Sequence, residues 1–376
     1  MDKELFNSYL NKYIHLLGLY LNKSVSDEIV NDNELSFFIN LSKRHSLTAL
    51  LYKALRDTKV DVNKEYLNKL EQYYLANLRK AVLFENERKE LYKYLNDNQI
   101  DYLPLKGIIL KDYYLDQYTR EFADNDILFR NKDEIVKKFF TERKYDVESF
   151  KKSNHDVYMK KPCYNFEMHR ALFGESIKND KVVKYYNDIF NRANIKDGHE
   201  YVLSHEDFYI YFTAHSFKHF NNSGCGIRTL IDYYQFLKNN NLDFDYINKE
   251  LEKLDLLDFS NMISTLSNKL FNGLSLDDKE QEILLYIASS GTYGTLEHAV
   301  TKGVKEQGKF KYMMSRVFPP MSVYKSLYPW AYKTKVLIPV AWLIRAFRIL
   351  FKNPKRAATE LKMISKSDAK KEEKKQ

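Results

Sequence analysis

Residues 1–98 place their apolar side chains at the spacing of helices. This stretch contains no proline and a single glycine, Gly18, so little in it would interrupt a helix. The apolar positions that recur at helical spacing are Leu5, Leu10, Ile14, Leu17 and Leu21, and later Leu75, Leu78, Val82, Leu83, Leu91 and Leu95. The pattern predicts a helical N-terminal layer over 1–98, whose last helix covers roughly 75–98.

The period of the pattern changes at Ile100, where short apolar runs replace the helical stripes. Alternation of polar and apolar residues predicts strands, and apolar residues four apart predict helices. In chain order the predicted elements are a strand at 100–105, a helix at 108–118, a strand at 124–129, a helix at 132–143 and a hairpin of strands 155–160 and 164–169. Strands separated by helices and followed by a hairpin indicate a small mixed-sheet core over 99–172.

Helical spacing returns after this core. The segment 204–207 has the form of a capping box and predicts the start of one helix. Further helices are predicted at 227–238, 247–270 and 275–289. We expect a helical C-terminal domain over 173–300 and a basic tail over 301–376. The expected fold class is therefore α+β, with the small mixed-sheet core inserted between a helical N-terminal layer and the helical C-terminal domain.

The formal charge of +9 is concentrated at the end of the chain. Residues 301–376 hold 19 Lys and Arg against 5 Asp and Glu, a net of +14, which leaves −5 for residues 1–300. A mildly acidic body does not fit a fold that coats nucleic acid, so we expect no nucleic-acid partner. The two cysteines, Cys163 and Cys225, form no CxxC motif, which excludes a disulfide scaffold and a cysteine zinc site and indicates the cytoplasm.

Acidic residues fall on one face of the strand predicted at 124–129. Side chains two apart on a strand share a face, so Asp124 and Asp126 lie side by side. Adjacent carboxylates repel unless a cation lies between them, and Mg²⁺ prefers carboxylate oxygens together with phosphates. Glu167 shares a face with His169 on the hairpin, and with the two aspartates it would make a cluster able to hold two Mg²⁺ ions. We therefore predict Asp124, Asp126 and Glu167 as catalytic and metal-binding residues.

Candidate phosphate ligands precede these acids. Gly107 opens a predicted helix directly after a strand, where backbone N–H groups can approach a phosphate. Lys106 and Arg120 supply the counter-charges, so Lys106, Gly107 and Arg120 are the predicted nucleotide ligands. An alternative for Arg120 is an ion pair that braces Asp124.

Taken together, the motifs resemble one protein family. They are Lys106-Gly107, Tyr113 or Tyr114, Arg120, Asp124-x-Asp126, Glu167-Met168-His169, His215-x-x-x-His219 and Arg228-x-x-x-Asp232. These residues resemble the uncharacterised nucleotidyltransferase family of the DNA polymerase beta superfold. The resemblance implies a nucleotidyltransferase core, with Asp124 and Asp126 as metal ligands and Glu167 as the third carboxylate. It also implies a link to surface-polysaccharide biosynthesis.

The expected reaction is Mg²⁺-dependent transfer of a nucleotidyl group from an NTP to a hydroxyl or phosphate acceptor, such as a saccharide or a protein. The chain departs from the superfold in two respects. Asn125 replaces the apolar residue usually found between the two acids, and Ile108 rather than a serine or a second glycine follows Gly107. The second departure motivates an alternative of another class, a catalytically inactive nucleotidyltransferase-like module that binds a partner in a membrane-proximal assembly.

Some of these residues keep a second interpretation. Glu175 or Asp156 could replace Glu167 as the third carboxylate. His215 and His219 lie four apart on one predicted helix face, but they share it with aromatic residues, which favours packing over a zinc site. Asp232 is expected to pair with Arg228 or with a helix end rather than to take part in chemistry.

The basic tail contains an amphipathic segment near 336–352. Its apolar run, 336–351, is 16 residues long and too short to span a bilayer. The basic residues Arg345, Arg348 and Lys352 form one stripe, and the apolar residues Trp342, Leu343, Phe347 and Leu350 lie elsewhere on the helix. This pattern predicts a helix that lies on an anionic membrane, at the inner face of the cell membrane. The alternative is a last helix packed on the body of the protein.

Overall fold

The computed structural model divides the chain into two compact units. The first is Met1–Lys218 with Cys225–Thr292, and the second is His219–Gly224 with Tyr293–Gln376. The described residues are 2–121, 123–174, 177, 179–222, 224–292, 300, 304, 307–319, 321, 324, 328–352, 358–360 and 362–364, with backbone alone at 317, 329, 346 and 348–352. We describe each unit by itself.

The first unit begins with the predicted helical layer. Its helices are α1 (Lys3–Leu21), α2 (Asp32–His45), α3 (Thr48–Asp57) and α4 (Lys64–Asp97). Side-chain hydrogen bonds cap the N-termini of the first two helices. Asp2 caps α1, and Asn31 forms a capping box with Glu34 at α2. A two-residue parallel pair, β1 (Ile29–Val30) with β2 (Asp61–Val62), was not predicted.

Helix α4 is longer than the predicted 75–98, and only the C-terminal part of the predicted apolar stripe, Leu91 and Leu95, is buried. Leu75 and Val82 are exposed, whereas the buried side chains are Leu70, Ala81, Phe84, Arg88, Leu91 and Leu95. These positions continue a repeat of alternate threes and fours that passes through Tyr74 and Asn77. The prediction was wrong at Leu75 and Val82, because the buried face there is continued by polar residues, which make hydrogen bonds to Asp116 and Tyr118.

A seven-stranded mixed sheet forms the centre of the first unit. Its strands, in spatial order, are β5 (Asp146–Ser149), β6 (His155–Lys160), β7 (Tyr164–His169), β4 (Asn125–Phe129), β3 (Tyr102–Pro104), β9 (Glu200–Val202) and β8 (Asn194–Asp197). The predicted hairpin of β6 and β7 is confirmed with its bounds. Strands β4 and β7 are parallel, and Asp126 lies opposite Glu167.

The helix predicted at 108–118 is wrong. The structure has a single turn, α5 (Gly107–Leu110), and two 3₁₀ turns, η1 (Lys111–Tyr113) and η2 (Gln117–Thr119). The backbone becomes extended at Tyr114, whose hydroxyl donates a hydrogen bond to Asp232. This tertiary contact outweighs the local helical spacing.

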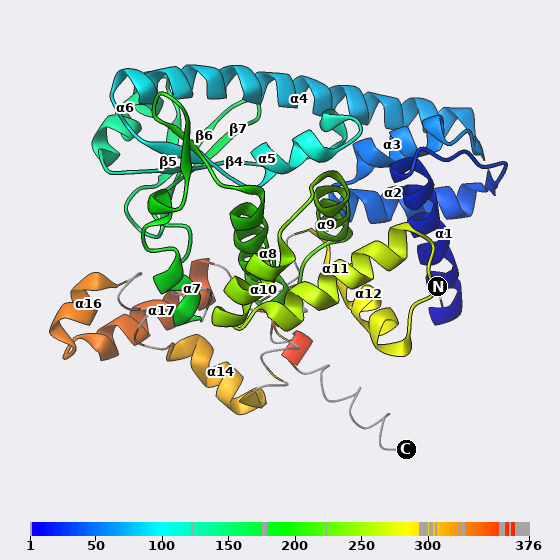
Figure 1. Ribbon diagram of the computed structural model, residues 1–376. Helices are drawn as coiled ribbons and strands as arrows, with labels where there is room; N and C mark the ends of the chain where they lie inside the picture. The colour runs from blue at the N-terminus through cyan, green and yellow to red at the C-terminus, as the bar shows by residue number, and fades with distance from the viewer. Residues whose placement is uncertain are drawn as a thin grey trace. The chain divides into compact units, whose positions relative to one another are not determined.

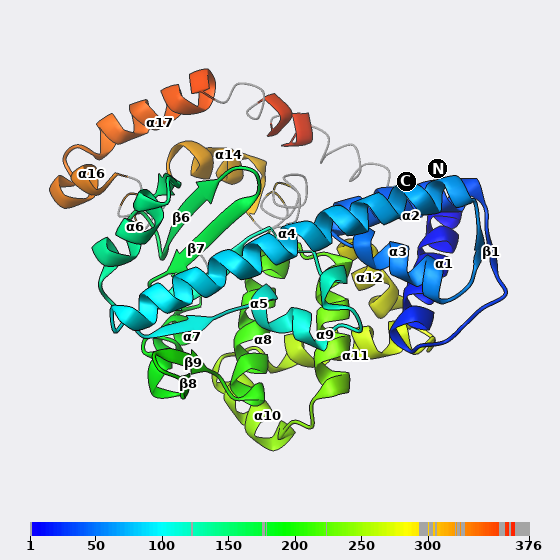
Figure 2. The same cartoon turned by 90° about the horizontal axis from the view of Figure 1, so that it is seen from above.

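Apolar side chains cover one face of the sheet. Ile127, Phe129, Phe166 and Met168 pack under α4 and α6 (Asp133–Glu142), in one core cluster with Leu91 and Phe140. Figures 1 and 2 show α4 running across this face of the sheet and on to the N-terminal helices. Because strand side chains alternate, Asp126, Glu167 and His169 point to the opposite face.

Helices follow the sheet in the C-terminal direction. They are α7 (Asp180–Tyr185), the 3₁₀ turn η4 (Ile189–Asn191), α8 (His205–Asn222), α9 (Ile227–Asn239), α10 (Phe244–Lys253), α11 (Leu257–Phe271) and α12 (Asp278–Ser290). The stretch predicted as one helix at 247–270 is two, α10 and α11. The α+β fold class, a small mixed sheet between helical parts, is confirmed.

The second unit contains α14 (Lys309–Val317), α16 (Pro329–Thr334) and α17 (Ile338–Lys352). Its small core joins Tyr324, Tyr328, Ala331 and Ala341. Among the described residues, no helix is both long enough and apolar enough to cross a bilayer.

Candidate active site

Three acidic side chains gather on the sheet face opposite α4. Asp126 belongs to β4 and is 3% exposed, Asp124 precedes the strand by one residue, and Glu167 lies opposite Asp126 on β7. Burial and the charge of Asp126 raise the pKa of Asp124. Burial, together with the charges of Asp126 and Asp124, raises the pKa of Glu167 to about 7. The structure thus brings the three predicted carboxylates close enough to repel one another.

Lys106 and His169, both among the described residues, donate hydrogen bonds to the Asp126 carboxylate. Lys106 Nζ donates to its Oδ1 at 2.5 Å, and His169 Nε2 donates to the same oxygen at 2.8 Å. Burial alone would raise the pKa of Asp126, but Lys106 and His169 lower it below the ordinary value. Asp126 is therefore ionised at neutral pH, with the Lys106 ammonium as its counter-ion.

Lys106 reaches Asp126 from a sharp turn. Its backbone φ of 48° lies in the left-handed region, directly before α5, where a lysine is uncommon and costs free energy. Gly107 begins α5, which is only four residues long, so few aligned peptide dipoles stand behind its N–H group. Lys106 is accordingly placed at the carboxylates, while Gly107 opens a single helical turn.

Arg120 is engaged with α9. Its Nε donates to Asp232 Oδ1 at 2.7 Å and its Nη2 to Asp232 Oδ2 at 2.8 Å, both side chains being buried. Asp232 therefore pairs with Arg120, and the predicted pairing with Arg228 was wrong, since Arg228 donates to the backbone carbonyl of Glu121. This bidentate pair ties α9 to the segment that leads into β4 and so positions Asp124.

The alternatives for the third carboxylate do not share this location. Asp156 on β6 lies opposite Met168 on β7, so its side chain points to the apolar side of the sheet. There it accepts a hydrogen bond from the Lys151 N–H group. Glu175 lies outside the described residues. Among the described acids, Glu167 is the strand residue that stands next to Asp126.

Sequence reasoning missed Lys218. Burial and the nearby Lys106 lower the pKa of Lys218, while the charges of Glu167 and Asp126 act in the opposite direction and raise it. We find no hydrogen bond or ion pair for its ammonium within the described part of the chain. Tyr211, His215 and Lys218 are spaced four and three apart on α8, so the helical period was the available signal for this residue.

The donor set fits a divalent cation. Carboxylates of Asp124, Asp126 and Glu167 are the hard oxygen ligands that Mg²⁺ takes. Single ligand atoms of His155, Glu167 and His169 lie within 4.8 Å of one another, and the buried Nδ1 of His169 has no hydrogen-bond partner among the described residues. His215 and His219 belong to no such group of three among the described side chains.

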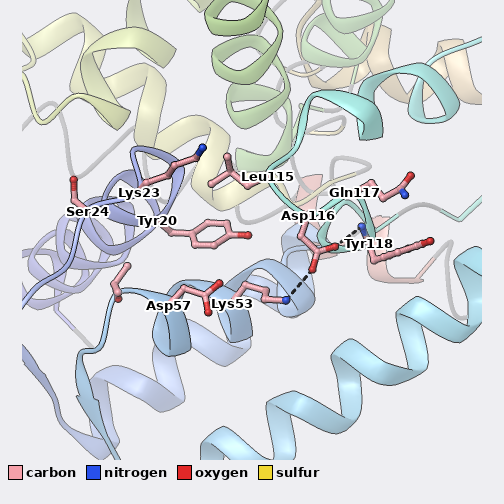
Figure 3. A pocket seen from close by; sticks show the side chains of 10 residues that line it. Tyr20, Lys23, Ser24, Lys53, Asp57, Leu115, Asp116, Gln117 and Tyr118 are labelled. Carbon is pink, nitrogen blue, oxygen red and sulfur yellow. Dashed lines mark hydrogen bonds and ion pairs between the residues drawn. The ribbon is translucent and has the colours of Figure 1, made fainter.

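A separate cavity of about 590 Å³ lies at α1, α3 and the turn before Arg120. Figure 3 shows the Tyr20 side chain directed into it and Lys53 Nζ bonded to Asp116. The predicted catalytic and phosphate-binding residues do not line this cavity. The chemistry expected of the carboxylates therefore belongs to the sheet face and not to this hollow.

Comparison with known proteins bears on these assignments. The family model described as uncharacterised nucleotidyltransferase matches residues 31–272, which is more than half of the chain. No curated protein and no solved structure matches the chain. The matched span contains β3, β4, β6 and β7 and all the acidic residues of the site. The chain therefore belongs to the uncharacterised nucleotidyltransferase family and is a nucleotidyltransferase, an enzyme class that takes an NTP as substrate.

Proposed function

We propose that the chain transfers a nucleotidyl group from an NTP to a hydroxyl or phosphate acceptor in a Mg²⁺-dependent reaction at Asp124, Asp126 and Glu167. The observation that carries the proposal is the parallel pairing of β4 with β7, which sets Asp126 opposite Glu167. Three carboxylates on one sheet face, with a lysine already bonded to the most buried of them, make a site for cations and phosphates.

Each residue has a role in this proposal. Asp124, Asp126 and Glu167 hold the metal, which when bound offsets the charge of the phosphates and lowers the pKa of an acceptor oxygen. Lys106 exchanges part of its contact with Asp126 for a phosphate oxygen, and Lys218 adds a second positive charge from α8. Arg120 acts through Asp232 as a positioning residue.

The acceptor we propose is a saccharide or a protein hydroxyl in surface-polysaccharide biosynthesis. Family resemblance supports this choice, and the acidic charge of residues 1–300 argues against a nucleic-acid acceptor. The competing function is a catalytically inactive binding module, favoured by Ile108 in the position after Gly107.

A thermal-shift screen of the four NTPs, with and without Mg²⁺, tests the proposal. We expect one NTP to stabilise the protein only when Mg²⁺ is present, and Asp124→Asn to remove that shift because it removes a metal-binding charge without changing shape. Binding followed by pyrophosphate release supports the enzyme. A nucleotide that binds equally well without Mg²⁺ and with Asp124→Asn contradicts the proposal and favours the binding module.

We also propose that the second unit binds the surface of an anionic membrane. The exposed apolar side chains on and just before α17 are Val336, Leu337, Val340, Leu343, Ile344 and Phe347. Within the helix, Val340, Leu343, Ile344 and Phe347 lie, at 100° per residue, within about one third of the circumference. Such an apolar stripe in a segment of net charge +14 supports interfacial binding.

Two details of the predicted membrane helix were wrong. Trp342 does not lie on the exposed stripe, because it packs against Phe318 with ring centroids 4.8 Å apart and joins the core of the second unit. Arg345 donates from Nε to the Arg316 carbonyl oxygen at 2.9 Å, so its guanidinium is turned toward the protein. The side chains of Arg348, Leu350 and Lys352 lie outside the described residues.

A further inference from the structure

We propose that the cavity at α1, α3 and η2 binds a neutral saccharide unit, at a second ligand site apart from the carboxylates. Its volume of about 590 Å³ is in the range of small-molecule sites. The side chains that line it come from the C-terminal ends of α1 and α3 and from residues 115–118. The proposal concerns binding alone, so it does not depend on nucleotidyl transfer at Asp124 and Asp126.

A buried phenol inside the cavity has an open hydroxyl group. Tyr20 is 5% exposed, and its side chain points into the cavity (Figure 3). Within the described part of the chain, its hydroxyl makes no hydrogen bond. Burial, with the charges of Asp116 and Asp57, raises the pKa of Tyr20, so the hydroxyl stays protonated and can both donate and accept. Buried polar groups nearly always have a partner, which points to a ligand at this hydroxyl.

The charges around the cavity are already matched, which favours a neutral ligand. Lys53 Nζ lies 2.9 Å from Asp116 Oδ2, and Arg56 Nε donates to Asp57 Oδ1 at 2.6 Å. Lys23 follows the C-terminus of α1, where its charge offsets the negative end of the helix dipole. A phosphate would meet two helix C-termini and two carboxylates, and a cation would meet two lysines.

Paired charges of opposite sign suit hydroxyl groups. One hydroxyl can donate to a carboxylate and accept from an ammonium group at the same time. Asp116 has room for such a bond, because its Oδ1 accepts one hydrogen bond among the described residues, from the Tyr118 N–H group. Leu115 lines the same cavity and is 42% exposed, so it offers an apolar surface to the C–H groups of a sugar ring. A ligand with several hydroxyls on an apolar ring is a saccharide.

The test is saturation-transfer difference NMR on the full-length protein with glucose, galactose, mannose and N-acetylglucosamine, each titrated separately. We expect at least one of them to bind, and inorganic phosphate not to compete with it. Tyr20→Phe removes the hydroxyl alone and should lower the affinity about fivefold, the loss expected for one hydrogen bond. Leu115→Trp fills the cavity from an exposed position and should abolish the signal.

Tyr9→Phe and Leu5→Trp are the matched controls, since both positions lie in the first half of α1 and outside the cavity. Both should bind the sugar as the wild type does, and so should Asp124→Asn, because the carboxylates form a separate site. No binding of any of the four sugars would overturn the inference. Binding that survives both Tyr20→Phe and Leu115→Trp, or that phosphate displaces, would overturn it as well.

Discussion

Lys106 and Lys218 are two lysines with opposite environments at the same site. Lys106 is bonded to the buried Asp126, whereas Lys218 faces the same acids with no ion pair among the described residues. A buried charge that loses its partner destabilises a protein strongly, while a partly buried lysine without an ion-pair partner costs stability and does not add to it. The two residues should therefore respond differently to the same substitution.

Lys106→Met should lower the free energy of unfolding by about 3 kcal/mol, because it leaves Asp126 buried without its cation. Added divalent metal should restore more stability to this variant than to the wild type. Lys218→Met should leave stability at or slightly above the wild-type value and raise the KM for the NTP. Chemical denaturation with and without metal measures the first pair of effects. Similar losses of stability in both variants would contradict the assignment.

Substitutions in the Arg120–Asp232 pair test whether Arg120 has a structural role or contacts a phosphate. Arg120→Met should cost about 3–5 kcal/mol, since it strands a buried carboxylate. The double variant Arg120→Met/Asp232→Leu should recover most of that loss, because an apolar pair can replace a buried ion pair. A double-mutant cycle in urea gives the coupling. Single and double variants of equal stability would show that the pair carries no such coupling.

At the level of elements, strong periodic segments were predictable and short polar ones were not. The β6–β7 hairpin alternates cleanly and was predicted with its bounds. Strands β8 and β9 were missed because β8 reads Asn-Ile-Lys-Asp and is exposed along its whole length, so no burial pattern marks it. Asp124, Asp126 and Glu167 could be placed on one face from strand period alone, but the His155–His169 juxtaposition needed the cross-strand register.

His45 joins three helices and makes stability depend on pH. Its Nε2 donates to the Ala288 carbonyl oxygen of α12 at 3.0 Å, and its Nδ1 accepts from the Ile227 N–H group of α9 at 3.1 Å. Only a neutral imidazole can make both bonds. Burial, with the charges of Arg44 and Arg228, lowers the pKa of His45 to about 4, against a backbone bond to Ala288 that raises it.

The sign of the pH effect follows from that shift. The unfolded chain takes up a proton below a pKa of about 6.5, while the folded protein resists it until about pH 4. Stability should therefore be fully present above pH 6.5 and fall by about 3 kcal/mol between pH 6.5 and 4. His45→Gln should flatten this part of the stability profile, whereas His15→Gln should not. Identical profiles for wild type and His45→Gln would contradict the account.

At the scale of the whole molecule, the second unit combines a large positive charge with exposed apolar side chains. Leu343 and Phe347 in the second unit are 72% and 63% exposed, in the part of the chain with a net charge of +14. Leu343→Glu with Phe347→Glu should reduce partitioning onto anionic liposomes by at least about a hundredfold, because each side chain buried in lipid contributes about 1.5–3 kcal/mol. Sedimentation of the protein with liposomes measures this.

A matched control makes the same change of charge in the first unit. Val25→Glu with Leu274→Glu replaces two exposed apolar residues there, and liposome binding should stay within a fewfold of wild type. Raised salt should weaken binding of the intact protein. Full-length protein that ignores anionic liposomes at low salt would contradict the membrane proposal.

The central claim is that Asp124 and Asp126 bind the metal that holds the NTP. Calorimetric titration of the preferred NTP into the protein, with and without divalent metal, tests it most directly. The wild type and Asp112→Asn, a matched change at an exposed carboxylate, should bind the NTP only with metal. Asp124→Asn/Asp126→Asn should stay folded and lose that binding. Equal NTP affinity in the double variant and the wild type, in the presence of metal, would contradict the account.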